Sequence, residues 1–259
     1  MYSKYIFLLK TLSKVLSVKK IKFFQLLFDN LMGIGNDDIE NEIKNVTKIL
    51  NKNVEFVFDI GAGHGAYTEK LLKQYPNANF FLFEPQKVCY KYLLKKFKTN
   101  KKVKIYNLAI SNKIKSTNLY YDKKGSGLAS LIKRNLIDHN LKFNKIEKIK
   151  TTTLISFFKN NFNKKTNIDL CKIDIEGHEL LVLNSIKKIF KNFNVIQFEF
   201  GGANIDSRTY FKDYWFCLKN NFLIYRICPN KLILIDKYSE AEERFNLTNY
   251  LAVNKKYIL

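Results

Sequence analysis

Apolar and polar residues follow a helical period over the first fifty residues of the chain. Apolar side chains recur there every three or four positions, and this spacing predicts helices. The recurring positions are Leu8, Leu9, Leu12, Val15 and Leu16 in a first stretch and Phe23, Phe24, Leu27, Phe28 and Leu31 in a second. After Gly33 and Gly35, we expect Asn36 or Asp37 to cap a third helix, which carries Ile39, Ile43, Val46 and Leu50.

From residue 54 the period changes to short, mostly apolar runs that alternate with helical segments. Five runs predict core strands, at Val54–Asp59, Phe80–Glu84, Val103–Tyr106, Ile168–Asp174 and Val195–Phe200. A strand pair around Pro229–Lys231 and a last strand near Tyr250–Val253 follow a helical segment. Strands that alternate with helices form parallel sheets. We therefore expect a Rossmann-like, doubly wound α/β sheet that is mostly parallel, with an antiparallel C-terminal strand and additional N-terminal helices.

The change of period divides the chain into an N-terminal helical extension over residues 1–50 and an α/β domain over residues 51–259. Basic, aromatic helices of this kind either lie in a membrane interface or pack as a flap on the core. We favour the flap because lysines interrupt both faces of the predicted helices. Within the α/β domain, residues 114–152 favour β structure and loops.

A glycine-rich loop joins the first predicted strand to the following helix. Gly61, Gly63 and Gly65 permit a tight turn and a close approach of the backbone to a ligand. With Ala66 the loop also satisfies the dinucleotide pattern G-x-G-x-x-[GA], and Glu84 has a spacing suited to a ribose contact. The loop alone does not separate a nicotinamide cofactor from other nucleosides.

Asp59 favours a cationic ligand over a dinucleotide. It ends the first strand, two residues before Gly61. A carboxylate there repels the pyrophosphate that a dinucleotide places at a helix N-terminus. It attracts the ammonium and sulfonium groups of S-adenosylmethionine, while Glu84 can accept hydrogen bonds from the ribose hydroxyls. The alternatives are a loop-capping role for Asp59 and a helix-dipole role for Glu84.

These features resemble those of the FkbM-like methyltransferases, a branch of the Rossmann-like S-adenosylmethionine enzymes. The matching stretches lie within residues 54–200 and are Phe58–Gly65, Phe83–Pro85, Asn107–Ser111, Gly127–Leu131, Thr152–Leu154 and Lys172–Glu179. The resemblance implies transfer of a methyl group to oxygen, often on sugars of glycans or on natural products, with S-adenosylhomocysteine as the product. The chain departs from the family at Gly63, where Asn is usual, and at Ile155, where Asp is usual.

Residues at the carboxyl ends of the strands are the candidates for both halves of the site, since ligands of such sheets bind at that edge. The expected cofactor-binding residues are Asp59, Gly61, Ala62, Gly63, Gly65, Glu84, Pro85, Asn107 and Ala109. An alcohol that is methylated must lose its proton, so a general base is useful. Asp174 is the first candidate for this base or for orienting the acceptor, and His178 is the second.

Other polar residues near the fourth and fifth strands have less defined roles. Glu199 can hold a sugar hydroxyl or orient His178. Asp174, Glu176 and Glu199 have the chemistry to hold a divalent metal, but nothing in their spacing requires one, and we assign no metal site. His64 is expected to cover the cofactor, and His139 has no assigned role.

Charge changes the range of partners to consider. The net charge is +22, which favours phosphate-rich partners or an anionic membrane surface. However, only four of the 45 basic residues are arginines, and the abundance of Lys, Asn, Ile and Phe is typical of AT-rich codons. Because specific recognition of phosphates and bases prefers arginine, we expect only non-specific binding of nucleic acid. A weak association of the basic N-terminal helices with a membrane surface stays open.

The remaining composition is that of a folded intracellular protein. The chain is 46% hydrophobic, and its four cysteines have no CxxC spacing, which indicates reduced thiols. Without a signal peptide or an apolar run of membrane-spanning length, we expect a cytoplasmic location and a glycan or small-molecule acceptor.

Two other functions remain as alternatives. A ribose-directed RNA methyltransferase is one, because Asp174, Glu199 and nearby lysines resemble a Lys/Asp/Lys/Glu arrangement. A non-enzymatic module that binds nucleic acid or membrane through its lysines is the other, although it gives no reason for ordered carboxylates at strand ends. Methylation of base amino groups is disfavoured, because Asp174-Ile175-Glu176-Gly177 stands where an Asn/Asp-Pro-Pro-aromatic stretch is usual.

Overall fold

The computed structural model describes residues 16–35, 38–136 and 140–258. Several predicted positions lie outside the described residues: the helical positions Leu8, Leu9, Leu12 and Val15, the caps Asn36 and Asp37, and His139. The cap of helix α3 (Ile39–Ile49) is Asp38, whose Oδ1 accepts hydrogen bonds from the backbone N–H groups of Glu40 and Asn41. The predicted cap at Asn36 or Asp37 was therefore wrong.

Among the described residues, eight strands form a central sheet. Its order is β10 (Lys231–Ile235), β9 (Phe222–Cys228), β11 (Thr248–Asn254), β8 (Phe193–Phe200), β7 (Ile168–Ile173), β1 (Phe56–Ile60), β2 (Asn79–Phe83) and β3 (Val103–Tyr106). The strands from β8 to β3 are parallel, and β11 runs antiparallel to its neighbours β8 and β9. This arrangement confirms the predicted Rossmann-like sheet with an antiparallel C-terminal strand.

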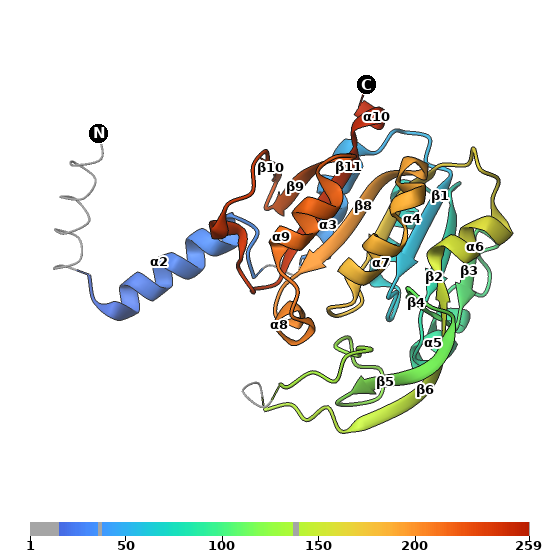
Figure 1. Cartoon of the computed structure of the whole chain (residues 1–259), viewed down its shortest axis with the longest axis horizontal. Helices are drawn as coiled ribbons and strands as arrows, with labels where there is room; N and C mark the ends of the chain where they lie inside the picture. The colour runs from blue at the N-terminus through green and yellow to red at the C-terminus, as the bar shows by residue number, and fades with distance from the viewer. Residues whose placement is uncertain (1–15, 36–37, 137–139, 259) are drawn as a thin grey trace.

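Helices cover both faces of the sheet (Figure 1). One face packs against α3, α4 (Ala66–Gln74) and α5 (Lys87–Lys96), and the other packs against α6 (Leu154–Asn161), α7 (Glu179–Ser185) and α9 (Phe211–Leu218). The alternation of side chains along a strand supplies both cores. In β1, Phe58 joins the core under α6 and α7, and the neighbouring Val57 joins the core under α3 and α4. Short helical segments complete the chain: η2 (Lys187–Asn192), α8 (Ala203–Ser207), η3 (Glu240–Glu242) and α10 (Lys255–Ile258).

A second, smaller sheet lies at the end of the molecule where the parallel strands of the first sheet finish (Figure 1). Its strand order is β4 (Ala109–Ser111), β6 (Lys145–Thr153) and β5 (Lys115–Tyr121). This sheet accounts for the β-leaning stretch between residues 114 and 152. At its end Thr153 caps α6, since the Thr153 hydroxyl accepts a hydrogen bond from Ser156 N at 3.1 Å. Helix α6 is therefore capped without an acidic residue at position 155, where Ile155 stands.

The N-terminal helices behave differently from one another. Helix α3 packs against the central sheet, as a flap requires. It buries Ile43 and Val46 there, together with its C-cap residue Leu50. By contrast, α2 (Val18–Leu31) projects from the body and buries none of its side chains (Figure 1). The flap interpretation is therefore confirmed for α3 and wrong for α2, because helical periodicity does not reveal which surface covers a helix.

None of the helices in the described part of the chain combines the length and the apolarity that a bilayer span needs.

Candidate active site

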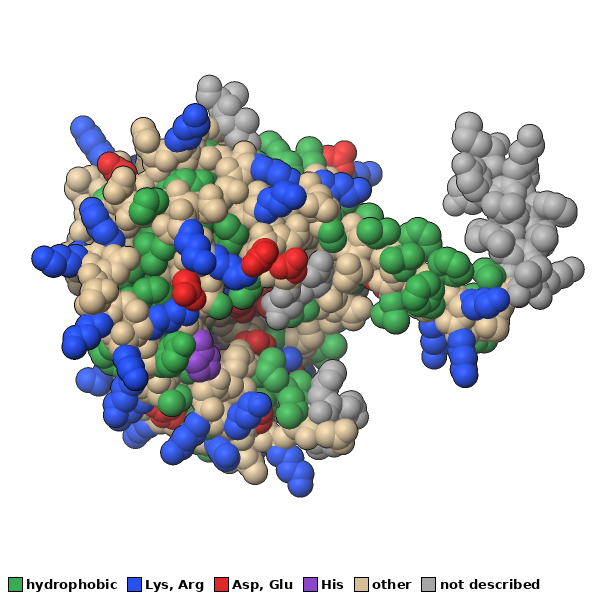
Figure 2. All heavy atoms as spheres, turned by 180° about the vertical axis from the view of Figure 1, so that it is seen from behind, with side chains coloured by type: hydrophobic (Ala, Val, Ile, Leu, Met, Phe, Trp, Pro, Cys, Tyr) green, Lys and Arg blue, Asp and Glu red, His purple; other side chains and the backbone are tan. Residues whose placement is uncertain are grey.

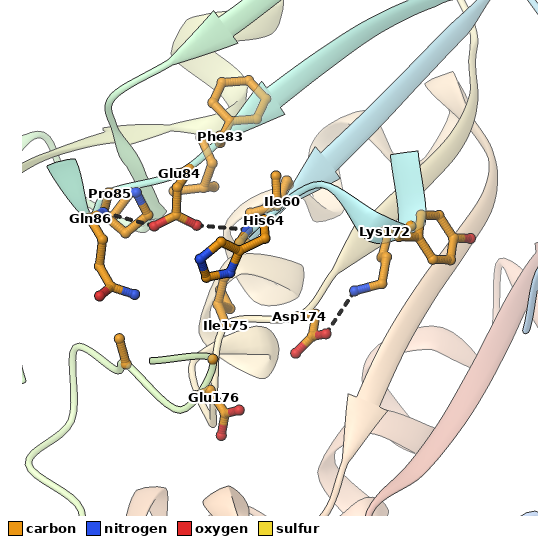
Figure 3. A pocket seen from close by; sticks show the side chains of 18 of the residues that line it. Ile60, His64, Phe83, Glu84, Pro85, Gln86, Lys172, Asp174, Ile175 and Glu176 are labelled. Atoms are coloured by element: carbon orange, nitrogen blue, oxygen red, sulfur yellow. Dashed lines mark hydrogen bonds and ion pairs between the residues drawn. The ribbon is translucent and has the colours of Figure 1, made fainter. Parts of the chain in front are cut away.

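A cavity of about 300 Å³ lies at the carboxyl ends of β1, β2 and β7, between the central sheet and the loops of the second sheet. The segments that line it include the glycine loop, the end of β2, the start of β4, residues 126–131 and the end of β7, together with Ile39 of α3 and Leu119 of β5. This volume is within the range of small-molecule sites. Figure 3 shows Glu84 on one side of His64 and the Lys172–Asp174 pair on the other.

The glycine loop fits tightly against β7 on one side and is open to the cavity on the other. Gly61 has φ +85°, and a Cβ there would lie 1.8 Å from the carbonyl oxygen of Asp174. Gly63 has φ +53°, but a Cβ there would meet no atom within 4 Å. Packing therefore requires a glycine at position 61 but leaves space for a side chain at position 63.

Glu84 is a buried carboxylate with partly satisfied oxygens. Its Oε2 accepts a hydrogen bond from Gly63 N at 2.9 Å, and its Oε1 accepts one from Gln86 N at 2.8 Å. Burial raises the pKa of Glu84 to about 7, although the two backbone N–H groups oppose that shift. Because each carboxylate oxygen can accept more than one hydrogen bond, Glu84 keeps capacity for two ligand hydroxyls.

Asn107 holds the backbone beneath Glu84. Its side-chain amide donates to the carbonyl oxygens of Glu84 at 2.9 Å and Pro85 at 2.8 Å. Asn107 does not line the cavity, so its contribution is to fix the turn that presents Glu84.

Asp59 lies behind the glycine loop and not in the cavity wall. It is 1% exposed, and its Oδ2 accepts a hydrogen bond from Thr68 Oγ1 at 2.5 Å. Burial raises the pKa of Asp59, while the ammonium of Lys172 and the Thr68 hydroxyl act against this. Its Oδ1 is buried and has no hydrogen-bond partner within the described ranges. A direct contact of Asp59 with a cationic ligand stays a prediction.

Lys172 and Asp174 form an ion pair at the end of β7, with 2.7 Å between Nζ and Oδ2. The Lys172 side chain is 9% exposed and the Asp174 side chain is 35% exposed, so the pair runs from the interior to the cavity. Burial alone would lower the pKa of Lys172, but the carboxylates of Asp174 and Asp59 outweigh it and raise that pKa. Lys172 therefore stays charged and holds one oxygen of Asp174.

A buried hydrogen-bond network continues behind Lys172. Gln197 Oε1 accepts from the hydroxyl of Tyr67 at 2.6 Å, and Gln197 Nε2 donates to Glu42 Oε2 at 2.5 Å. Asn249 Nδ2 donates to the other oxygen of Glu42 at 3.2 Å. Glu42 belongs to α3, and it contributes to the raised pKa of Lys172. Helix α3 is thus part of the charge balance of the site.

The loop from β7 to α7 is braced by Glu179. Its Oε1 accepts hydrogen bonds from the backbone N–H groups of Ile175 at 2.8 Å and Gly177 at 3.2 Å. Burial raises the pKa of Glu179 to about 7. Between the braced residues, Glu176 adopts a left-handed conformation with φ +56° and lines the cavity.

Four contacts fasten the loops of the second sheet beside the cavity. The Gln86 side chain donates to Ser126 O at 2.8 Å and accepts from Gly125 N at 3.1 Å. Ser130 Oγ donates to the Glu176 carbonyl at 2.8 Å, and Arg134 forms an ion pair with the Glu176 carboxylate. These polar contacts hold the loops to Gln86 and to Glu176, which both line the cavity.

His178 and Glu199 do not line the cavity. His178 Nε2 is 3.1 Å from Ser111 Oγ, and burial, helped by Lys115, lowers the pKa of His178 to about 4. Burial and the carboxylates of Asp174 and Glu176 raise the pKa of Glu199 well above its usual value. The catalytic roles of His178 and Glu199 stay predictions.

Across the three described ranges, no three acidic, histidine or cysteine side chains are grouped closely enough to hold a metal ion. Asp174, Glu176 and Glu199 are all among those residues, so their spacing along the strands does not translate into a shared ligand sphere.

The structure brings only part of the predicted set together. The predicted residues that line the cavity are Gly61, Ala62, Gly63, Glu84, Pro85, Ala109 and Asp174. Gly65 instead precedes α4 with φ +72°, packed beneath Leu93 and Phe97. Sequence analysis missed Lys172 and Gln86 as site residues. A signal for Lys172 existed, since a lysine inside a buried apolar strand requires carboxylate partners.

Comparison with known proteins gives one family. The profile of the methyltransferase FkbM domain matches residues 59–222. No curated protein sequence matches the chain significantly.

Solved structures with similar folds share little sequence with this chain. A precorrin-6y C5,15-methyltransferase from Geobacter metallireducens is 10% identical, with a TM-score of 0.46 over 86% of this chain and 98% of that chain. A dimethyladenosine transferase from Plasmodium falciparum is 14% identical, with a TM-score of 0.46 over 86% of this chain and 63% of that chain. A Streptococcus mutans protein in complex with SAH is 10% identical, with a TM-score of 0.45 over 85% of this chain and 98% of that chain.

The surroundings of Gly61 and Gly63 predict that substitution by alanine destabilises the fold more at Gly61 than at Gly63. Gly63→Ala should lower the free energy of unfolding by about 1–2 kcal/mol, the cost of a left-handed alanine. Gly61→Ala carries the same backbone cost and also a clash with the Asp174 carbonyl, so we expect a loss of about 2–5 kcal/mol. Urea unfolding of both variants measures the difference. Equal losses would show that the contact between the glycine loop and β7 is not tight.

Proposed function

The chain belongs to the methyltransferase family defined by the FkbM domain, and we propose that it methylates a hydroxyl oxygen of a sugar, a glycan or a small natural product. Its cofactor is S-adenosylmethionine, which supplies an electrophilic methyl group on a sulfonium sulfur. The observation that carries the proposal is the Lys172–Asp174 ion pair, because it brings a carboxylate to the same cavity that Glu84 lines.

The residues of the cavity fit this cofactor. Glu84 has acceptor capacity left for the two ribose hydroxyls, and the open side of Gly63 permits a close approach of the backbone. The carboxylate of Asp59 lies buried behind the glycine loop at this end of the cavity, and its negative charge suits the ammonium and sulfonium groups. The same charge opposes a pyrophosphate, so the fit favours S-adenosylmethionine over a nicotinamide dinucleotide.

Asp174 is the residue best suited to take the proton of the acceptor. Lys172 occupies its Oδ2, which leaves Oδ1 to accept a hydrogen bond from the acceptor hydroxyl. With the cofactor bound, the acceptor oxygen would bond to the methyl carbon as the carbon–sulfur bond breaks and S-adenosylhomocysteine is left, and Asp174 would accept the proton of the acceptor hydroxyl. Lys172 orients the carboxylate, and the polar contacts of Gln86 and Arg134 keep the surrounding loops in place.

The charge of the cavity supports an uncharged, hydroxyl-rich acceptor. Asp174 and Glu176 line it, and Glu199 lies near enough for both to raise its pKa. Acidic side chains this close exchange hydrogen bonds with hydroxyls, and burial raises the pKa of both Glu176 and Glu199, which favours their uncharged forms. Ribose in RNA is the second candidate, since Glu199 stands beside the Lys172–Asp174 pair and the net charge is +22.

The raised pKa of Glu84 predicts that cofactor affinity depends on pH. Ribose hydroxyls donate to the carboxylate, so binding should release the proton that Glu84 holds below pH 7. Affinity should be constant above pH 8 and fall about tenfold for each pH unit well below 7. Titration calorimetry with S-adenosylhomocysteine measures this dependence.

Glu84→Gln is the matched variant for that titration. It should bind more weakly by about 1.5–3 kcal/mol at pH 8 and lose the dependence on pH. Glu176 and Glu179 also titrate near neutrality. A slope that survives in Glu84→Gln would therefore assign the effect to those residues and contradict the ribose contact.

Asp174→Asn should reduce methyl transfer by about 10²–10⁴ in rate and leave cofactor affinity unchanged, because asparagine keeps the shape but does not accept the proton. His178→Ala is the control, since His178 lies outside the cavity wall. Radiolabelled methyl transfer to the native acceptor, together with calorimetry, separates the two effects. A larger loss in His178→Ala would make His178 the base.

The acceptor class is tested with cells that contain or lack the gene. We expect a mass difference of one methyl group on glycans or small hydroxylated metabolites, measured by mass spectrometry of both fractions. Loss of a ribose methyl in RNA, with unchanged glycans, would replace the proposed acceptor with the second candidate.

A further inference from the structure

Helix α2 exposes an apolar stripe outside the active site. Ile21, Phe24, Phe28 and Leu31 follow one another at intervals of three and four residues, so they share one face. Their exposed fractions are 44%, 41%, 60% and 50%. Figure 2 shows hydrophobic side chains gathered on this projecting arm. Soluble proteins seldom leave a contiguous apolar face of this kind uncovered unless it binds a partner.

The attachment of α2 gives that face a defined direction. Asp29, on the polar face with Lys22 and Gln25, forms an ion pair with Arg244 of the body. Just after the helix, Gly35 N donates to Leu247 O at 2.7 Å, and a Cβ on Gly33 would lie 2.0 Å from Ile227 O. The polar side of the helix is therefore tied to the body near β9 and β11, and the apolar stripe lies on a different side.

The charges of this segment indicate what the stripe binds. Lys19, Lys20 and Lys22 stand in the first turns of α2, and all three are exposed. Asp29 is the only acidic residue before residue 36 of the sequence, and Arg244 neutralises it. A second copy of this chain would bring another +22 charge to the contact. An apolar stripe with adjacent lysines complements a surface whose outer layer carries anionic groups and whose interior is apolar.

We propose that α2 docks this methyltransferase on the surface of an anionic lipid bilayer. The helix lies in the plane of the interface, with Phe24 and Phe28 between the headgroups and the acyl chains and with the lysines against lipid phosphates. This docking holds the body at the membrane without crossing it. The inference does not depend on the acceptor or on the catalytic residues.

The test uses flotation of the full chain with vesicles of phosphatidylcholine, with and without phosphatidylglycerol. The chain should float with the anionic vesicles and bind the neutral ones at least about tenfold more weakly, since each lysine near such a surface contributes about 1 kcal/mol. The double variant Phe24→Ser/Phe28→Ser should lose about tenfold or more in partitioning to anionic vesicles. Its melting temperature should be unchanged, because neither ring is buried.

Phe216→Ser is the matched control, because Phe216 is 53% exposed and belongs to α9 instead of α2. It should bind vesicles as the unaltered chain does. The proposal is overturned if the unaltered chain stays unbound, or if the double variant and Phe216→Ser bind equally. Sedimentation velocity supplies the remaining outcome. A dimer that Phe24→Ser/Phe28→Ser converts to a monomer, without vesicle binding by either, would make a second copy the partner of the stripe.

Discussion

A buried row of polar side chains crosses the centre of the sheet, and the site is built around it. Asp59, Lys172 and Gln197 are register partners on β1, β7 and β8, so they lie side by side at the level where the strands end. A lysine buried in a parallel sheet is tolerated only with carboxylates close by, since removing one partner of a buried ion pair costs about 3–5 kcal/mol. Asp59 and Asp174 meet that need, one from the interior and one from the cavity.

This constraint ties the N-terminal helix α3 to the chemistry of the site. Glu42 receives hydrogen bonds from Gln197 and Asn249, and its charge helps to raise the pKa of Lys172. The cavity wall itself includes Ile39 at the start of α3. The helix therefore contributes polar contacts to the site as well as covering apolar surface. The predicted domain boundary at residue 50 stays a prediction, but α3 packs as part of the α/β domain.

Sequence reasoning succeeded where the position along a strand decides the position in space. Glu84 and Asp174 follow parallel strands, and the carboxyl ends of such strands meet at one edge, so their presence at one cavity was predictable. Sequence reasoning was incomplete where the direction of a side chain decides whether that side chain reaches the cavity. Asp59 and Asn107 also stand at strand ends, but they turn behind the glycine loop and under the β2 turn. The α2 result has a similar origin, because a periodic pattern specifies an apolar face and not its partner.

The distribution of charge separates the surface of this enzyme from its active site. Lysines give the chain its net charge of +22, but the residues around the acceptor end of the cavity are carboxylates, with Lys172 and Arg134 each already paired. Long-range attraction to polyanions is therefore a property of the exterior, whereas the cavity presents acidic side chains and cations that are already paired with them. An anionic surface can thus hold the protein without competing for its active site.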